Sequence, residues 1–217
     1  MSPLPSASAP DTRDRILDTA ERLFAAHGFD GTSLRQITEG AEVNLAAVNY
    51  HFGSKEELYT QVFIRRIVPI NVRRMEMLDT AVKAAGGRPV PVRAIFESFA
   101  RPVFEMADRA PGFLRLLGRN VGAPPAFMAP VMEAQFRPLI TRYVGLLQQA
   151  LPHLTPKAVF WRMHFMVGAT LHCASHHFTI DQMSGGLCHT HDVEEMLQHL
   201  SDFAVAGIGN LPERNSP

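Results

Sequence analysis

The chain is short of the residues and patterns that mark several classes of protein. Of its 217 residues only two are cysteine, Cys173 and Cys188, which is too few for the disulfide framework of a small secreted domain. No apolar run reaches the roughly 18 residues that a membrane-spanning helix needs, and no signal-peptide pattern occurs. We therefore expect a soluble protein of the reducing cytoplasm that has no membrane partner.

Excess charge of either sign is also missing. The 21 Lys and Arg residues balance 21 Asp and Glu, so the formal net charge is zero. This removes the simplest sequence argument for a nucleic-acid binder, which is a basic balance. Residues 11–58 are even acidic, with nine Asp and Glu against five Lys and Arg. Any DNA contact by this segment must rest on a few placed side chains.

The motifs of the common catalytic sites are absent. The sequence holds no Gly-rich phosphate loop, no G-x-S-x-G elbow and no H-E-x-x-H pair. Carboxylates on the expected helices mostly stand beside Arg or Lys, as they do on solvated faces. We expect a protein that is not an enzyme and has no cofactor.

What the chain does have is apolar residues at helical spacing. Hydrophobic residues make up 46% of the sequence, enough for a sizeable core. No segment alternates with the two-residue period of a strand, so the predicted fold class is all-α. Beyond the boundary GGRPVP, Pro and Gly punctuation predicts helices over 92–109, 112–120, 125–151, 156–177 and 191–207.

The segment from Ser33 to Lys55 contains two short helices joined by a tight turn. Ser33 with Gln36 forms a capping box that starts the first helix, and Gly40 weakens the pattern where that helix must stop. Asn44 caps the second helix, in which Val48, His51 and Phe52 recur at helical spacing. This arrangement is a helix-turn-helix, whose second helix lies in the DNA major groove.

The run TSLRQITEGAEVNLAAVNYHFGSKEELY, with the amphipathic helix before it, resembles the N-terminal DNA-binding domain of the TetR family of bacterial regulators. The resemblance covers about residues 12–63, and VNLAAVNYHFGSK is similar to the branch of the fatty-acid-responsive regulator PsrA. One departure is Glu42, because the family usually has Gly in this turn. A non-Gly residue at positive φ costs about 1–2 kcal/mol, so we expect the turn to shift by one residue, with Gly40 absorbing the strain.

The resemblance implies a double-stranded DNA operator as partner and a set of contact residues. Base edges would be read from the start of the second helix, and phosphates would be held by residues around it. The implied DNA-binding residues are Thr32, Ser33, Asn44, Leu45, Ala46, Ala47, Asn49, Tyr50, His51 and Lys55. The expected organisation is a disordered lead-in over 1–10, a three-helix head over 11–58, and a helical effector-binding and dimerisation body over 59–217, joined by one long helix.

The body is rich in Phe and Met, which suit an adaptable apolar pocket between helices. The candidate pocket residues are Phe96, Phe99, Phe113, Phe127, Met132, Phe136 and Met163. For a polar anchor at the pocket mouth we consider Arg101, Arg115, Arg119 and Asn120. A small apolar effector, such as a fatty acyl compound, is the expected ligand.

The expected helix over 156–177 is apolar on two faces, which predicts burial on both. One face would meet the body, and the other a second copy of the chain. The resemblance implies a homodimer of this kind, with Trp161, Phe165, Ala169 and His172 at the interface.

A cluster of His and Cys in the last third suggests a different function. His172 and His176 lie one helical turn apart, and Cys188 follows after a Gly-Gly turn, so these are candidate ligands of a transition metal. The other interpretation is a polar interface or helix end. We favour that interpretation and assign no metal, and we keep a metal-binding sensor or storage protein as the alternative to a ligand-responsive repressor.

Overall fold

The computed structural model describes residues 11–188 and 192–209, without the side chains of residues 108, 111, 176–179 and 209. Every regular element of these residues is a helix, so the predicted all-α class is confirmed. The head contains α1 (Thr12–His27), α2 (Leu34–Ala41) and α3 (Leu45–Phe52), followed by the long α4 (Lys55–Ala85). The body contains α5 (Val92–Arg109), α6 (Pro111–Gly122), η1 (Ala126–Met128), α7 (Ala129–Ala150), α8 (Pro156–Met183) and α9 (Val193–Gly209).

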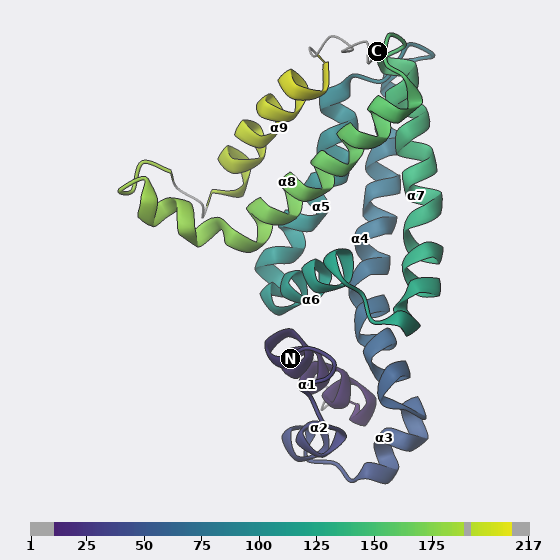
Figure 1. Cartoon of the computed structure of the whole chain (residues 1–217), viewed down its shortest axis with the longest axis vertical. Coiled ribbons are helices and arrows are strands. Elements are labelled where there is room, and N and C mark those ends of the chain that lie inside the picture. Colours follow the sequence, from purple (N-terminus) through teal and green to yellow (C-terminus); the bar gives the residue numbers. More distant parts are fainter. Residues whose placement is uncertain (1–10, 189–191, 210–217) are drawn as a thin grey trace, which may run out of the picture.

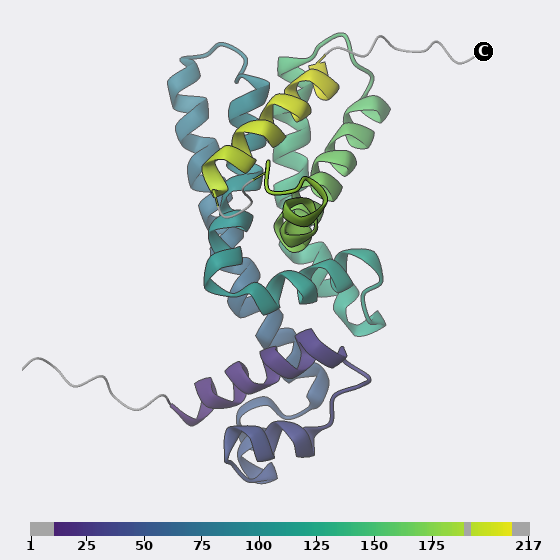
Figure 2. The ribbon, with the colours of Figure 1, turned by 90° about the vertical axis from the view of Figure 1, so that its left-hand side faces the viewer.

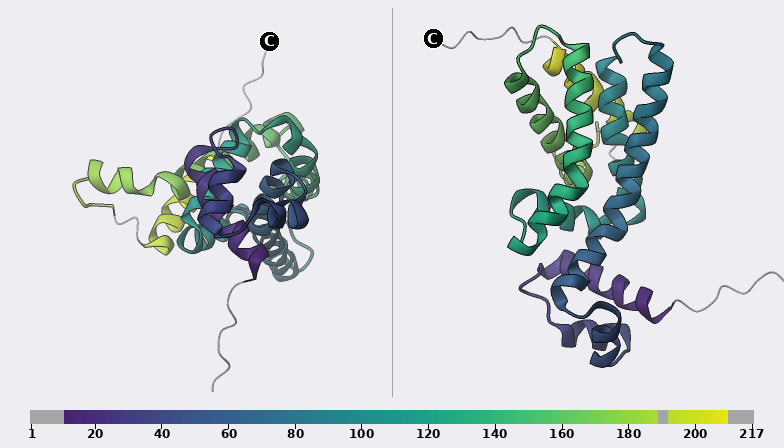
Figure 3. Two further views of the ribbon diagram at one scale, coloured as in Figure 1. Left: turned by 90° about the horizontal axis from the view of Figure 1, so that it is seen from below. Right: turned by 90° about the vertical axis from the view of Figure 1, so that its right-hand side faces the viewer.

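Figure 1 shows the head below the body, with α4 running from one into the other. Helices α4, α5 and α7 form an upright column, and α6 crosses its lower end above α1 (Figures 1 and 2). Helices α8 and α9 cover one side of this column, and the C-terminal part of α8 projects away from it (Figure 3). The expected boundary at residue 58 therefore falls inside a helix that both parts share.

The head folds around the predicted apolar stripe of α1. Ile16, Leu17, Ala20 and Phe24 have no exposed surface, and they pack with buried residues of α2, α3 and α4. Burying a side chain of this size stabilises a fold by about 1.5–3 kcal/mol. The stripe thus fixes the helix-turn-helix against the start of α4.

Capping sets the helix starts as the sequence predicts. The Ser33 Oγ atom accepts a hydrogen bond from the Gln36 amide at 3.2 Å, and the Gln36 Oε1 atom accepts one from the Ser33 amide at 2.8 Å. Ser54 caps α4 by accepting from the Glu57 amide at 3.1 Å. Gly86, at φ 58°, ends α4 in the left-handed conformation.

The predicted shift of the helix-turn-helix turn is wrong. Glu42 itself takes the left-handed conformation, at φ 54° and ψ 49°, while Gly40 stays within α2. Gly40 has a packing role instead, because a Cβ atom added there would lie 2.9 Å from the Thr19 Cγ2 atom of α1. The strain therefore stays at Glu42.

The head has an excess of acidic residues, which argues against DNA binding. Most of those that belong to α1 lie on its side facing α4. The Arg65 guanidinium lies 2.6 Å from the Asp18 carboxylate and 2.9 Å from that of Glu21, and Arg66 lies 2.9 Å from Glu21. These bonds also raise the pKa of Arg65 against the opposing effect of its burial. The acidic side of α1 is neutralised by basic residues just beyond residue 58.

Four of the five helices predicted for the body have other bounds. Helix α6 runs over Pro111–Gly122 rather than 112–120. Helix α7 begins at Ala129, after a short 3-10 turn over Ala126–Met128. Helix α8 continues to Met183, because the first residues after it at positive φ are Gly185 and Gly186. Helix α9 begins at Val193, and His191, its predicted first residue, lies outside the described residues.

Strain at Glu42 predicts a stability difference between two variants that both remove its charge. Glu42→Gly should be more stable than Glu42→Ala by about 1 kcal/mol, because only Gly adopts positive φ without a Cβ clash. Urea unfolding of the two proteins measures the difference. Equal stabilities would show that the turn relaxes without cost.

Candidate functional site

Helix α3 divides into a buried face and an exposed face. Val48 and Phe52 are 1% and 5% exposed and pack into the head core, whereas Leu45 is 50% and Tyr50 86% exposed. Ala46 and Asn49 are also exposed, and Ala47 is half-buried against the core. The residues expected at DNA base edges thus share the solvent side of one helix, except Ala47.

Asn44 has a structural role at the start of α3. Its side-chain Oδ1 atom accepts a hydrogen bond from the Ala47 amide at 2.9 Å, which satisfies one of the free amides of the helix end. Its own backbone is extended, at φ −88° and ψ 163°. Asn44 therefore sets where α3, and with it the exposed face of this helix, begins.

The residues expected at phosphates lie around the end of α3 and the start of α4. The Tyr50 and His51 rings meet edge to face, with centroids 5.1 Å apart. The Lys55 Nζ atom lies 4.2 Å from the centroid of the Phe29 ring, which holds this ammonium near the loop after α1. The Tyr50 side chain is exposed to solvent, while His51 and Lys55 are half-buried.

Thr32 and Ser33 differ in their availability. Thr32 is 1% exposed, and its hydroxyl donates to the Gly28 carbonyl at 2.8 Å. That side chain closes the loop between α1 and α2, so we leave it out of the proposed phosphate contacts. Ser33 is exposed at the start of α2, although its hydroxyl is engaged by Gln36.

A cavity of about 420 Å³ lies between five helices of the body and is open at the surface, since its lining residue Phe160 is 55% exposed. Its lining residues are Arg74 of α4, Phe99 of α5, Leu117 and Val121 of α6, Met132, Phe136, Leu139 and Ile140 of α7, and Phe160, Met163, His164, Val167 and Leu171 of α8. Volumes of this order hold small organic ligands. The lining is apolar except for Arg74 and His164.

The candidate pocket residues separate into two groups. Phe99, Met132, Phe136 and Met163 line the cavity. Phe96 and Phe113 are fully buried in the core and do not line it. Phe127 packs at the junction of head and body, with ring centroids 4.8 Å from Phe29 and 5.8 Å from Tyr59.

None of the four polar residues considered as anchors lines this cavity. Arg101 pairs with Glu194, and Arg115 and Arg119 are exposed. Asn120 is buried and donates to the Tyr59 hydroxyl at 3.0 Å, which links α6 to α4. The residue that sequence reasoning missed is Arg74.

A signal for Arg74 does exist in the sequence. Ile67, Ile70 and Leu78 are at most 2% exposed, and Arg74 falls in the same helical register between them. A charged residue in an apolar stripe must be buried with partners or must line an internal site.

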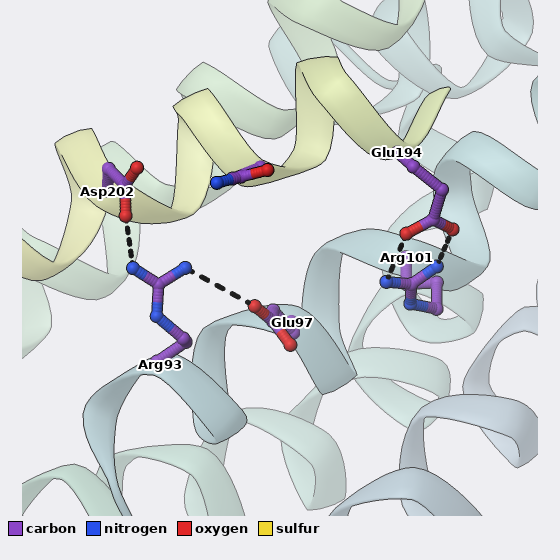
Figure 4. Close-up of a pocket in the computed structure, with 6 residues that line it drawn as sticks. Arg93, Glu97, Arg101, Glu194 and Asp202 are labelled. Atoms are coloured by element: carbon purple, nitrogen blue, oxygen red, sulfur yellow. Dashed lines mark hydrogen bonds and ion pairs between the residues drawn. The ribbon is translucent and has the colours of Figure 1, made fainter. Parts of the chain in front are cut away.

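A second hollow, of about 340 Å³, lies between α5 and α9 and is crossed by ion pairs (Figure 4). Arg93 contacts Asp202 and also Glu97, and Arg101 contacts Glu194 through both carboxylate oxygens. These side chains already satisfy one another, so the hollow holds α9 against α5. It offers no comparable ligand site.

An exposed aromatic patch lies on α8. Phe160 and Trp161 are each 55% exposed and Phe165 is 63% exposed, with the Trp161 and Phe165 rings stacked at 5.9 Å. Ala169 is half-buried and His172 exposed further along the helix, and Phe203 of α9 is 71% exposed. Clusters of exposed aromatic residues of this kind mark interaction surfaces.

The proposed metal ligands do not come together among the residues described. No group of three or more His, Cys, Asp or Glu side chains in that part of the chain could hold a metal ion. Burial raises the pKa of the Cys173 thiol, which disfavours the thiolate that binds metals. The side chain of His176 lies outside the described residues.

Two family models match the chain in the order that this architecture leads one to expect. "Bacterial regulatory proteins, tetR family" matches residues 16–62, the head and the start of α4. "Tetracyclin repressor-like, C-terminal domain" matches residues 97–207, about half of the chain. The chain belongs to the TetR family. In the described part of this TetR-family regulator, no helix is long and apolar enough to cross a membrane.

Curated relatives of this TetR-family chain match it over a short stretch. It is 40% identical over 47 residues to the biofilm operon icaADBC HTH-type negative transcriptional regulator IcaR of Staphylococcus epidermidis, and 41% identical over 49 residues to IcaR of Staphylococcus aureus. These matches span 22% and 23% of the chain and about a quarter, 25% and 26%, of the relatives.

Solved structures resemble the whole fold. The hemolysin II transcriptional regulator HlyIIR superposes with a TM-score of 0.61 at 20% identity, covering 88% of this chain and 97% of that one. A transcriptional regulator from Rhodococcus sp. Rha1 gives 0.63 at 17% identity, covering 91% and 96%. At these identities the likeness shows the fold alone.

The capping role of Asn44 predicts how the start of α3 responds to substitution. Asn44→Ala should lower the free energy of unfolding by about 1 kcal/mol, whereas Asn44→Ser, which keeps an acceptor, should lower it by only a few tenths. Urea unfolding of both variants measures this. If the two variants are equally stable, the side-chain cap has no energetic role.

Proposed function

We propose that this regulator is a homodimeric repressor that binds a palindromic operator and releases it when a small apolar molecule enters the body cavity. The observation that supports this proposal is that one chain combines an exposed α3 face, an exposed aromatic patch on α8 and an apolar cavity. The negative transcriptional regulators of Staphylococcus that are 40–41% identical over 47–49 residues of the chain support the direction of control.

In the proposed complex, α3 lies in the major groove. The Asn49 amide is suited to accept from and donate to one adenine, and the Ala46 methyl and Leu45 to contact thymine methyl groups. Tyr50, His51, Lys55 and Ser33 hold phosphates on either side and fix the position of α3. The acidic residues of α1 do not oppose this contact, because Arg65 and Arg66 neutralise Asp18 and Glu21.

The proposed dimer forms through α8 and α9 of two copies. Trp161 and Phe165 supply the apolar centre, and Phe203 extends it on α9. Two heads then meet half-sites about one helical turn of DNA apart, and a two-fold dimer matches a palindrome.

Control requires that the effector favour one of two states. Helix α6 connects the cavity to the head: Leu117 and Val121 line the cavity, while Asn120 between them bonds Tyr59 of α4. A Cβ atom built on Gly28, which follows α1, would lie 2.8 Å from an Arg119 nitrogen, so α6 also closely approaches α1. A ligand that moves α6 or tilts α4 alters the spacing of the two recognition helices.

The apolar lining favours an effector with an apolar body, and a fatty acyl compound fits this character. The resemblance of VNLAAVNYHFGSK to the branch of PsrA supports the same class. A metal sensor has no comparable support among the described residues. Selection of bound sequences from a random DNA pool would identify the operator, and failure to enrich any palindromic sequence would argue against the proposal.

The two kinds of head contact should be separable by mutation. Tyr50→Ala should weaken binding to all DNA sequences, whereas Asn49→Ala should cost about 1–3 kcal/mol and relax preference at one base position. Binding to the selected operator and to single-base variants of it measures both effects. An Asn49→Ala protein with unchanged affinity and sequence preference would remove this residue from the contact set.

The aromatic patch predicts the assembly. Phe165→Glu should convert the dimer to monomer, because it places a charge at the centre of an apolar contact. Val72→Glu, which changes an apolar residue of α4 that is 51% exposed, is the matched control and should stay dimeric. Sedimentation velocity distinguishes the two, and a stable Phe165→Glu dimer would place the interface elsewhere.

A further inference from the structure

Arg74 is a buried cation at the wall of a cavity whose other lining residues are apolar except for His164. It is 3% exposed, and its guanidinium lies 4.0 Å from the centroid of the Phe99 ring. The Nε atom donates to the Phe99 carbonyl at 2.9 Å, and the Nη1 atom donates to the Asn71 Oδ1 atom at 3.1 Å. These bonds fix the plane of the guanidinium beside the cavity.

No carboxylate among the described residues pairs with Arg74. The neighbouring arginines of α4 differ in this respect, since Arg65 and Arg66 bond to acids of α1 and Arg73 lies 3.6 Å from Glu76. Tyr143, the titratable group that acts on Arg74, is neutral, because burial raises the pKa of its phenol to about 12. Among the described residues, Arg74 therefore has hydrogen-bond partners but no negatively charged partner.

Arg74 nevertheless stays charged at neutral pH. Burial lowers the pKa of its guanidinium to about 10, which is still well above 7. A charge removed from water without a counter-ion is costly to a fold. A cost of this kind is common where a site awaits a ligand of the opposite charge.

The rest of the wall defines the remainder of that ligand. Leu117, Leu139, Met163 and Leu171 are among the apolar side chains that surround the space, and His164 is the second polar residue. A small inorganic anion would leave this apolar surface unfilled. A neutral apolar molecule would leave Arg74 unpaired.

We propose that the cavity binds an apolar carboxylic acid, with the ligand carboxylate paired to the Arg74 guanidinium and the hydrocarbon part among the side chains of α6, α7 and α8. This inference rests on the proposed function and narrows its effector to a free acid. An acyl thioester has no carboxylate at that position and is excluded as the preferred ligand. Alkyl and aryl acids share the required chemistry.

The same contacts connect the carboxylate to three helices. Arg74 bonds the α5 backbone at Phe99, and Asn71 donates from its side chain to the Gln135 carbonyl of α7 at 3.0 Å. A carboxylate that draws the guanidinium toward the cavity pulls on each of these bonds. Arg74 thus acts as a specificity-determining residue placed on the helix that reaches the head.

The first test compares matched ligands on the unmodified protein. Isothermal titration at pH 8 would use dodecanoate and its methyl ester, with 4-hexylbenzoate and its methyl ester as the aryl pair and dodecanoyl-coenzyme A as the thioester. We expect each acid to bind about 10–100-fold more tightly than its ester, as a charge-assisted hydrogen bond implies. Equal affinity of acid and ester, or no binding by either acid, would overturn the inference.

The second test removes the charge. Arg74→Met should lower dodecanoate affinity about 10–100-fold and leave the methyl ester unchanged. Arg73→Met changes the preceding residue, whose side chain is 51% exposed, and is the matched control that should bind dodecanoate as the unmodified protein does. If Arg74→Met does not fold by circular dichroism, Arg74→Gln replaces it, and the comparison of acid with ester stands without any variant.

Operator release separates this inference from the proposed function. If acids bind through Arg74 but leave operator affinity unchanged, the ligand assignment holds and the effector role fails. If esters release the operator as well as acids do, and Arg74→Met responds normally, the effector role holds and the carboxylate assignment fails. If dodecanoate releases the unmodified protein and the Arg73→Met variant from the operator but does not release the Arg74→Met variant, both the ligand assignment and the effector role are supported.

Discussion

The structure depends on one helix that runs from the head into the body through a single shared core. Leu58, Val62, Ile67, Ile70 and Leu78 of α4 form one buried stripe along the helix. Phe63 is buried with them and contacts Phe113 of α6, with ring centroids 5.9 Å apart. The bonds of Arg65 and Arg66 to α1 fasten the head at the crossing. Because α4 packs against α1 of the head and α5 of the body, a change in the tilt of this helix affects both parts. The sharing that stabilises the chain thus also provides the route from cavity to DNA.

Among the described residues, two departures from the rules that stabilise a fold lie at the two ends of this route. Glu42 holds the helix-turn-helix turn at positive φ, and Arg74 carries a buried charge without a counter-ion. Departures of this kind concentrate at functional sites. The Glu42 conformation sets the angle between α2 and α3, while Arg74 makes the empty cavity less favourable than one that holds an anion.

Much of the head follows from local signals, and the body follows only in outline. Ser33, Gln36 and Asn44 act within three residues of themselves, so capping placed α2 and α3 correctly. Which Phe residues line a cavity depends on how α6, α7 and α8 cross, and spacing alone does not separate Phe99 from Phe96. The choice of Gly40 for the turn failed for a similar reason, since its contact with Thr19 lies across two helices.

The apolar residues and Arg74 have different roles in the cavity, because a ligand shifts the equilibrium between two states only through contacts that differ between them. Apolar contacts along α7 and α8 add affinity in any conformation that keeps the cavity closed, and affinity that is equal in both states shifts nothing. The proposed ion pair between Arg74 and the ligand carboxylate is directional, because hydrogen bonds to Phe99 and Asn71 fix the guanidinium. The pair therefore has good geometry in one arrangement of α4 and α5. The ligand's tail therefore sets how tightly it binds. In the proposed mechanism, its carboxylate sets which position of α4 it stabilises, and hence the spacing of the two α3 helices.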